Sequence, residues 1–453
     1  MMRIGWGQAE ITPRGGAISL YGQWDTRITR QVNDPLRAVA MAIATEEGDV
    51  VWVGCDLCYI SQNMMRAAHD EIRRQRPDFP FAHLIVSATH IHTGPCLDND
   101  RFVARLDGVH DDAGALTTRE CMEQVARGVA RAALMALSSM RESIVEVGVA
   151  REQTGVCRRA TYQDGSAQMY GDVHREDFCG MEGRDGGPMQ FLYVYDAVRC
   201  DLTGVVANIP CPAQCDEHAS YVTADYFGVV RSRLQEALGE AVCLLPLVRA
   251  AGDLSPHDMV DRMPGIERCE GRSGALHMGN RVACALLRER ERPVSTLKSA
   301  TRVRHASKDI PFPIWSATEE EYRESKAFLQ AHSANNTPGM LYSTHYTRVK
   351  RYESGRTHYV APVHALRMGG VVLLSNPFEL YIAYADRIRM RLAQAHVFDV
   401  QLACEPLAYL PTPQAVRGGH YSAVNFVCAC GPQAGELLVD ESVRLVEKLY
   451  QGA

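Results

Sequence analysis

The first 150 residues alternate between apolar stretches of strand length and longer stretches with helical periodicity. We expect strands over residues 50–57 and 82–92, which are dominated by apolar residues. We expect helices over residues 63–75 and 117–140, where apolar residues recur every three or four positions. Strands separated by helices in this way are typical of layered α/β cores. The sequence therefore predicts an α/β fold with mixed β-sheets flanked by helices.

The rest of the chain continues this alternation without a visible boundary. Strand-like runs recur at 143–150, 188–197, 202–211, 242–253 and 369–377, and helices are predicted over 225–238, 318–332 and 378–395. Residues 260–280 and the remainder of 305–345 are rich in Gly, Pro and polar residues, which predicts long loops. Because no repeat or low-complexity linker divides the chain, residues 1–453 are expected to form one large catalytic domain.

Composition excludes several functional classes. Hydrophobic residues make up 46% of the chain and charged residues 23%, which is the balance of a soluble globular protein. The formal net charge of -6 and the lack of a basic block argue against nucleic-acid binding. The sequence contains no run of about 18 apolar residues, so no membrane-spanning helix is predicted.

Cysteine usage and the N-terminus indicate the compartment. The opening MMRIGWGQAEITP does not resemble a signal peptide. The fifteen cysteines are scattered and odd in number, so we expect reduced thiols that are mostly buried. Together these features predict a cytoplasmic protein that does not insert into membranes.

The stretch SATHIHTGP at 87–95 carries two histidines, His90 and His92, at the end of a predicted strand. In a strand, residues two positions apart point to the same face, so the two imidazoles are expected to converge. Strand ends are also where α/β sheets commonly place their sites. Metal binding is one interpretation of this pair, and two histidines in a polar loop is the other.

Three further stretches contain candidates for chemistry. In AAGDLSPHD at 250–258, Asp253 and Ser255 follow a strand, and Ser255 is either a nucleophile or oxyanion donor or an ordinary turn residue. Glu379 is expected in the first turn of a helix, as a capping charge or a zinc ligand. Tyr409 and Tyr421 lie in a Pro- and Gly-rich loop, where most tyrosines pack.

Taken in order, these stretches resemble the catalytic domain of the neutral (alkaline, non-lysosomal) ceramidase family. The segments that carry the resemblance are GWGQAEITPRGG, DPLRAVAMAI, SATHIHTGP, CRRATYQDG, GDLSPHD, NPFELY and AYLPTPQAVRGGHY. SATHIHTGP is similar to the family's S-x-T-H-T-H-S-G-P, and GDLSPHD to its G-D-x-S-P-N. The resemblance covers residues 3 to 425.

The resemblance implies roles for individual residues. His90, Glu379 and Tyr409 would hold one metal ion per chain, for which zinc is the expected identity. His92, Arg158 and Tyr421 would line the reacting amide. Ser255 would be the catalytic serine, and Asp253, which precedes it in the same motif, would be a further catalytic residue. The implied reaction is hydrolysis of a carboxamide bond.

The chain departs from the family in two places. The family's second metal histidine lies in a motif similar to N-F-A-x-H-P-T, and NIPCPAQCDEH places Pro212 at that position. We rank His92 first as its replacement, then Cys211, then His218, with Cys215 as a further nearby candidate. The chain also ends before the position of the family's C-terminal immunoglobulin-like domain, so the fold is expected without that domain.

The sequence thus predicts a zinc-dependent amidase that acts on a small soluble N-acyl compound rather than on ceramide. Two alternatives remain: an amide-forming enzyme of the same superfamily, and a non-catalytic binding protein whose metal site has degenerated. The only partner predicted is the small-molecule amide substrate. The sequence leaves open whether copies of the chain form a homo-oligomer.

Overall fold

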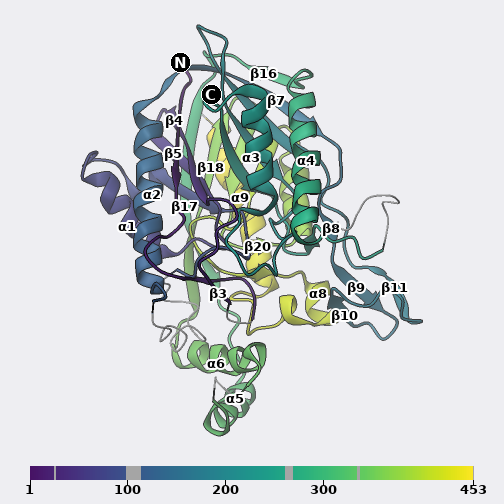
Figure 1. Cartoon of the computed structure of the whole chain (residues 1–453). Coiled ribbons are helices and arrows are strands. Elements are labelled where there is room, and N and C mark those ends of the chain that lie inside the picture. Colours follow the sequence, from purple (N-terminus) through teal and green to yellow (C-terminus); the bar gives the residue numbers. More distant parts are fainter. Residues whose placement is uncertain (25–26, 98–113, 261–268, 334–336, 452–453) are drawn as a thin grey trace.

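A computed structural model describes residues 1–24, 27–97, 114–260, 269–333 and 337–451 of the protein. It has the predicted α/β architecture, with mixed sheets at the centre and helices outside them (Figure 1). The helices are α1 (Gln62–Arg73), α2 (Thr118–Ser138), α3 (Asp225–Leu238), α4 (Gly271–Glu289), α5 (Glu319–Ala331), α6 (Gly339–Glu353), α7 (Ile382–Arg391), α8 (Pro413–Gly418) and α9 (Pro432–Tyr450).

The larger sheet joins the N-terminal strands to those in the middle of the chain. Its order is β14 (Cys243–Val248), β13 (Leu202–Ile209), β12 (Met189–Asp196), β7 (Arg141–Ala150), β1 (Arg3–Glu10), β4 (Arg37–Thr45), β5 (Gly48–Cys55) and β6 (Leu84–Ala88), with β16 (Ser295–Leu297) on β7. The β13–β14 and β5–β6 pairs are parallel and the others antiparallel. The parallel pairs explain why those strands read as continuous apolar runs.

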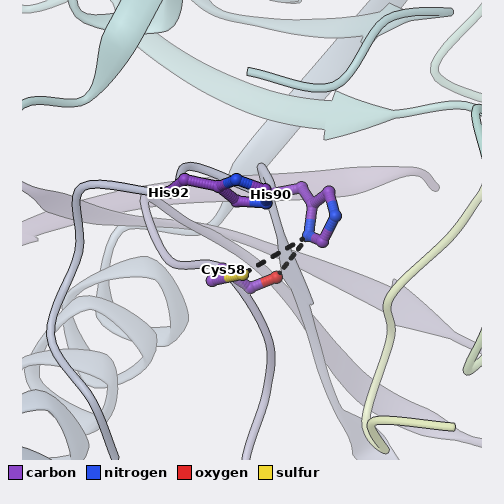
Figure 2. Close-up of side chains that lie close together, drawn as sticks. All are labelled: Cys58, His90 and His92. Carbon is purple, nitrogen blue, oxygen red and sulfur yellow. Dashed lines mark hydrogen bonds between the residues drawn. The ribbon is translucent and has the colours of Figure 1, made fainter. Parts of the chain in front are cut away.

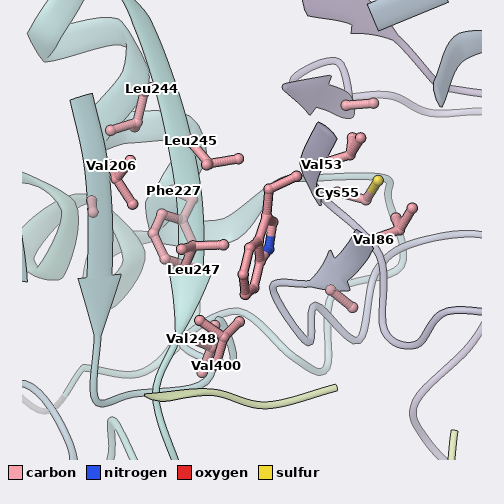
Figure 3. Close-up of a cluster of buried hydrophobic side chains, with 14 of the residues drawn as sticks. Val53, Cys55, Val86, Val206, Phe227, Leu244, Leu245, Leu247, Val248 and Val400 are labelled. Carbon is pink, nitrogen blue, oxygen red and sulfur yellow. The ribbon is translucent and has the colours of Figure 1, made fainter. Parts of the chain in front are cut away.

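The two ends of this sheet pack face to face. A Cβ at Gly54 in β5 would lie 2.4 Å from the Pro246 carbonyl oxygen in β14, so only glycine permits this approach. Leu245 and Leu247 of β14 share a buried cluster with Val53 of β5 (Figure 3). The core between these strands holds the loops at their ends in fixed positions, and those loops carry the site.

Helix α2 covers the outer face of β1 and begins where its sequence predicts. Thr117 and Glu120 form a capping box, in which each side chain accepts a hydrogen bond from the other's backbone N–H. The helix packs closely on β1 because Gly5 and Gly7 lack side chains; a Cβ at either would lie 2.1 Å from a carbonyl oxygen of α2.

A second sheet occupies a region that the sequence partly misassigns. It consists of β17 (Val303–Pro313), β18 (His358–Met368), β19 (Val371–Ser375) and β21 (His396–Val400), and α9 packs on β17 and β18. Long loops were predicted around helix 318–332; instead, β17 precedes that helix and α6 follows it. In β17, exposed Ser307, Lys308 and Asp309 obscure the apolar alternation of a strand.

Three short strand pairs and one three-stranded sheet hold the loops near the site. They are β2 (Ile18–Leu20) with β3 (Arg27–Thr29), β8 (Val156–Cys157) with β15 (Leu254–Ser255), β9 (Arg159–Tyr162) with β10 (Ala167–Met169) and β11 (Phe178–Met181), and β20 (Glu379–Leu380) with β22 (Tyr409–Leu410). Helices α5 and α6 project from the bottom of the molecule in the view of Figure 1.

The cysteines and helices agree with two further predictions. None of the fifteen cysteines is part of a disulfide, and most are buried. Among the helices in the described parts of the chain, none has the length and apolar character needed to cross a bilayer.

Candidate active site

A cavity of about 1810 Å³ lies beside the ends of β6 and β22. Its lining comes from segments far apart in the sequence, including the loop after β2, the ends of β5 and β6, the segment after β13, helix α6 and the loop around Tyr421. Of the predicted site residues, His90, His92, Arg158, Glu379, Tyr409 and Tyr421 all line this cavity. The fold therefore gathers six candidates that span more than 300 positions of sequence.

The two histidines converge, but not as neighbours in a strand. Strand β6 ends at Ala88, and His90 has a left-handed backbone with φ 66°. His90 N donates to the Leu57 carbonyl oxygen at 2.9 Å, which fixes this turn. The ring centroids of His90 and His92 lie 5.1 Å apart at an interplanar angle of 77°. The strand predicted over 82–92 therefore ends earlier than expected, at Ala88. The argument that the two histidines share one face of a strand is wrong, although their rings do lie close together.

The His90 ring has a different partner on each nitrogen. Nδ1 lies 2.8 Å from the Cys58 carbonyl oxygen and 3.6 Å from the Cys58 sulfur (Figure 2). Nε2 lies 3.1 Å from Oε2 of Glu379. Burial disfavours the charged imidazole, but the charges of Glu379 and Cys58 outweigh it and raise the pKa of His90.

Glu379 is presented by a strand pair and not by a helix. It lies in β20, in parallel register with Tyr409 of β22, and α7 begins three residues later at Ile382. The predicted position in the first turn of a helix is therefore wrong. Burial opposes ionisation of Glu379, yet the charge and hydrogen bond of His90, together with a hydrogen bond from Tyr409, lower its pKa.

His92 is held by a carboxylate that the sequence analysis did not weigh. Nδ1 of His92 lies 2.9 Å from Oε2 of Glu217, and Gln23 Nε2 lies within 3.2 Å of the same nitrogen. Nε2 of His92 lies 2.7 Å from the Gln214 side-chain amide nitrogen. Burial raises the pKa of Glu217, but the His92 hydrogen bond and charge outweigh burial and lower it to about 2.

Cys58 is the second residue that sequence reasoning missed. Its sulfur and one ring nitrogen each from His90 and His92 lie within 4.8 Å of one another, which is close enough for all three to share a metal ion. Burial raises the pKa of the thiol, but the two imidazoles outweigh it and lower the pKa to about 7. The only local signal for this role was the position of Cys58 just beyond the end of a strand.

Arg158 links the cavity wall to the β20–β22 pair. Its guanidinium donates to the Tyr170 hydroxyl at 2.8 Å, to the Gly252 carbonyl oxygen at 3.0 Å and to the Tyr409 hydroxyl at 3.2 Å. The Tyr421 ring lies 6.1 Å from that of Tyr409. Burial raises the pKa of Tyr421, so its hydroxyl keeps its proton at neutral pH.

Ser255 and Asp253 lie beneath the cavity wall. Ser255 is fully buried, its Oγ accepts from His257 N at 3.1 Å, and the Tyr170 hydroxyl lies 3.4 Å away. Asp253 accepts a hydrogen bond from Ile382 N at 2.9 Å, and burial raises its pKa to about 6. Neither residue lines the cavity. Tyr170 does line it, and its hydroxyl connects Ser255 to the cavity wall.

The segment that should carry a second histidine does reach the site. Ala213 N, next to Pro212, donates to the Thr89 carbonyl oxygen at 3.1 Å. Cys211 is fully buried, its thiol donates to the Pro212 carbonyl oxygen at 3.4 Å, and it does not line the cavity. The His218 side chain is 80% exposed. Of the three ranked replacements, His92 is the one that lies beside His90.

The donors present suit zinc. Imidazole nitrogen, carboxylate oxygen and thiolate sulfur are its usual protein ligands. Two donor sets meet at the His90 ring: Glu379 on the Nε2 side, with Tyr409 behind it, and Cys58 with His92 on the Nδ1 side.

Comparison with known proteins identifies structures that share this fold. No protein-family model matches the chain, and no curated protein matches it. Among solved structures, the chain is similar to the neutral ceramidase from Pseudomonas aeruginosa, with a TM-score of 0.75 and 17% identity over 99% of this chain and 75% of that one. A structure described as ceramidase complexed with C2 matches at a TM-score of 0.73 and 16% identity, with the same coverage. The chain therefore has the neutral ceramidase fold, as its motifs predict.

Proposed function

We propose that the protein is a metal-dependent hydrolase of carboxamide bonds. The observation that carries the proposal is the meeting of His90, Glu379, Arg158 and Tyr409 in one cavity of a ceramidase-like fold. When bound at His90, a divalent metal such as zinc supplies Lewis-acid polarisation of the substrate carbonyl and lowers the pKa of water.

The chain's own residues account for substrate positioning. Arg158 is fixed by hydrogen bonds to Tyr170 and Gly252, and its contact with the Tyr409 hydroxyl directs its charge toward the cavity. This charge and the protonated hydroxyl of Tyr421 can orient a carbonyl oxygen. His92 is held by Glu217, so it can hold a proton for the departing amine.

Charged residues on the cavity wall support a small polar amide as the substrate rather than a lipid. Exposed charged residues of both signs line it: Asp172, Glu270, Lys350 and Arg356. Burying a long alkyl chain against charged groups would cost their hydration. We therefore propose an N-acyl substrate with a short acyl part, and cytoplasmic localisation remains a prediction from the sequence.

The experiment is hydrolysis of a panel of N-acyl amides of increasing chain length, with ceramide at its end. We expect cleavage of short members, loss of cleavage after dialysis against a chelator, and recovery with zinc. His90→Ala should lose both zinc and activity, whereas His174→Ala, an exposed residue of the same cavity, should keep both.

The same panel decides between the proposal and its alternatives. Condensation of a free acid with an amine, faster than hydrolysis, would indicate the amide-forming enzyme. Stoichiometric zinc without turnover in either direction would indicate a binding protein, the alternative suggested by Pro212.

A further inference from the structure

The two sides of the His90 ring offer different metal sites, and one nitrogen can bind only one ion. On the Nε2 side, Glu379 Oε2 lies 3.1 Å away. On the Nδ1 side lie the Cys58 sulfur and the His92 ring. The resemblance to ceramidases assigns the first side, but that assignment includes a second histidine whose place Pro212 occupies.

The distances on the Nδ1 side match those of a tetrahedral centre. Zinc bonds of about 2.3 Å to sulfur and about 2.0–2.1 Å to nitrogen hold two tetrahedral ligands about 3.6 Å apart. The Cys58 sulfur lies 3.6 Å from Nδ1 of His90. A nitrogen of His92 completes the group within 4.8 Å.

Both histidines have a carboxylate on the opposite ring nitrogen. Glu379 Oε2 faces Nε2 of His90, and Glu217 Oε2 faces Nδ1 of His92. A carboxylate that accepts the N–H of one nitrogen leaves the lone pair of the other for a metal, an arrangement common around zinc. By this criterion the nitrogens left for a metal are Nδ1 of His90, which faces the Cys58 carbonyl oxygen at 2.8 Å, and Nε2 of His92, which faces the Gln214 amide nitrogen at 2.7 Å.

The polar groups on the metal-facing side are incompletely satisfied. Nδ1 of His90 lies 2.8 Å from a carbonyl oxygen while Nε2 faces a carboxylate, so oxygen acceptors lie on both sides of the ring. A neutral imidazole has one N–H, so it can satisfy only one of these two acceptors. The amide nitrogen of Gln214 lies 2.7 Å from Nε2 of His92, and the oxygen of the same amide is buried and has no hydrogen-bond partner.

We propose that Cys58, His90 and His92 form the metal site, with Glu379 and Glu217 as the carboxylates that orient the two rings. The thiolate of Cys58 then takes the place of the histidine that is missing at Pro212. This inference rests on the proposed metal dependence of the site, changes which residues hold the ion, and gives His92 a ligand role in place of holding a proton for the departing amine. Glu379 becomes a positioning residue, and Tyr409 lies outside the ligand set.

The test replaces zinc with cobalt and records the absorption spectrum. Sulfur bound to Co²⁺ gives a ligand-to-metal charge-transfer band in the near ultraviolet, which nitrogen and oxygen ligands do not give. We expect this band in the wild-type protein at one equivalent of Co²⁺. Cys58→Ser and Cys58→Ala should both abolish it and weaken zinc binding at least about 10-fold, with circular dichroism confirming the fold.

Two matched variants sharpen the result. Cys96 also lines the cavity, and its thiol faces Ser19 Oγ at 3.8 Å, so Cys96→Ala should keep the band. Tyr409→Phe should keep both the band and the zinc affinity, whereas the ligand set implied by the ceramidase resemblance requires loss of affinity.

The outcomes separate this inference from the proposed function. Bound Co²⁺ with amide hydrolysis but no charge-transfer band would overturn the Cys58 site and leave the hydrolase proposal standing. A band that disappears in Cys58→Ser, without turnover of any amide, would support the site and contradict the hydrolase. Failure of the wild-type protein to bind Co²⁺ or zinc would overturn both.

Discussion

Oε2 of Glu217 lies 2.9 Å from Nδ1 of His92, and both side chains are largely buried. The carboxylate fixes the ring's tautomer and orientation, which a neutral amide would do less strongly. The interaction connects the segment after β13 to the loop after β6, so it joins two chain segments that the sequence analysis treated separately.

Replacing Glu217 with glutamine should weaken zinc binding by about 10- to 100-fold and lower kcat/KM. The isosteric amide keeps the shape of the side chain but loses the charge that holds the imidazole. Zinc affinity measured by competition with a chromophoric chelator tests the first effect. The control is Glu270→Gln, because Glu270 is exposed and lies 3.5 Å from His257. Equal affinities in the two variants would contradict the positioning role.

Ser255→Ala tests the catalytic role expected from the GDLSPHD segment. Loss of a nucleophile or an oxyanion donor lowers turnover by about 100-fold or more, and we expect a loss of that size with zinc content unchanged. Because Ser255 contacts the cavity through Tyr170, the matched variant is Tyr170→Phe. A loss under about tenfold in Ser255→Ala would reassign the serine to support of Tyr170.

Arg158→Lys should lower kcat/KM by about 100-fold while zinc content stays constant. The guanidinium satisfies Tyr170, Gly252 and Tyr409 together, and an ammonium group cannot reach all three in the same geometry. The buried Gly252 carbonyl would then lose a partner, which costs about 1–3 kcal/mol of unfolding free energy. Steady-state kinetics and denaturant unfolding measure the two effects separately. Wild-type kinetics in a destabilised variant would limit Arg158 to a structural role.

Acid should destabilise the fold through His305 and His364. Burial lowers the pKa of His305 to about 4 and that of His364 to about 3, against about 6.5 in an unfolded chain. Between pH 6.5 and these values the unfolded state binds protons that the folded state rejects, so stability falls as pH falls. The slope is about 1.4 kcal/mol per pH unit for each histidine.

The measurement is urea unfolding at several values between pH 7 and pH 4. The comparison is between slopes and not absolute stabilities, because His364→Gln also removes the ring that lies 3.3 Å from His305. The variant should lose stability less steeply than the wild type as pH falls. Parallel curves would show that these histidines do not control acid unfolding.

Local sequence patterns predicted helices well where the chain has clear periodicity or capping residues. The helix predicted over 225–238 coincides with α3, and Thr117 and Glu120 mark the start of α2. The motifs also predicted part of the site, because six of the side chains that they single out line one cavity. Their roles in catalysis and metal binding remain predictions.

The remainder depended on contacts that no local pattern encodes. Glu379 was assigned to a helix because the apolar periodicity of α7 extends back to it, yet pairing with Tyr409, thirty positions away, makes it part of a strand. Cys58 and Glu217 carry no motif of their own, and only the fold places them beside His90 and His92. The motifs therefore identified the imidazoles and Glu379, but not Cys58 and Glu217, which also contact those rings.

The left-handed backbone of His90 has an energetic consequence. A residue with a side chain pays roughly 1–2 kcal/mol for this conformation, and glycine would not. Glycine would remove this cost, but it would leave the largely buried Glu379 carboxylate without its imidazole partner, which costs about 3–5 kcal/mol. A histidine at a position where the backbone prefers glycine indicates that the contacts of its ring outweigh the backbone cost.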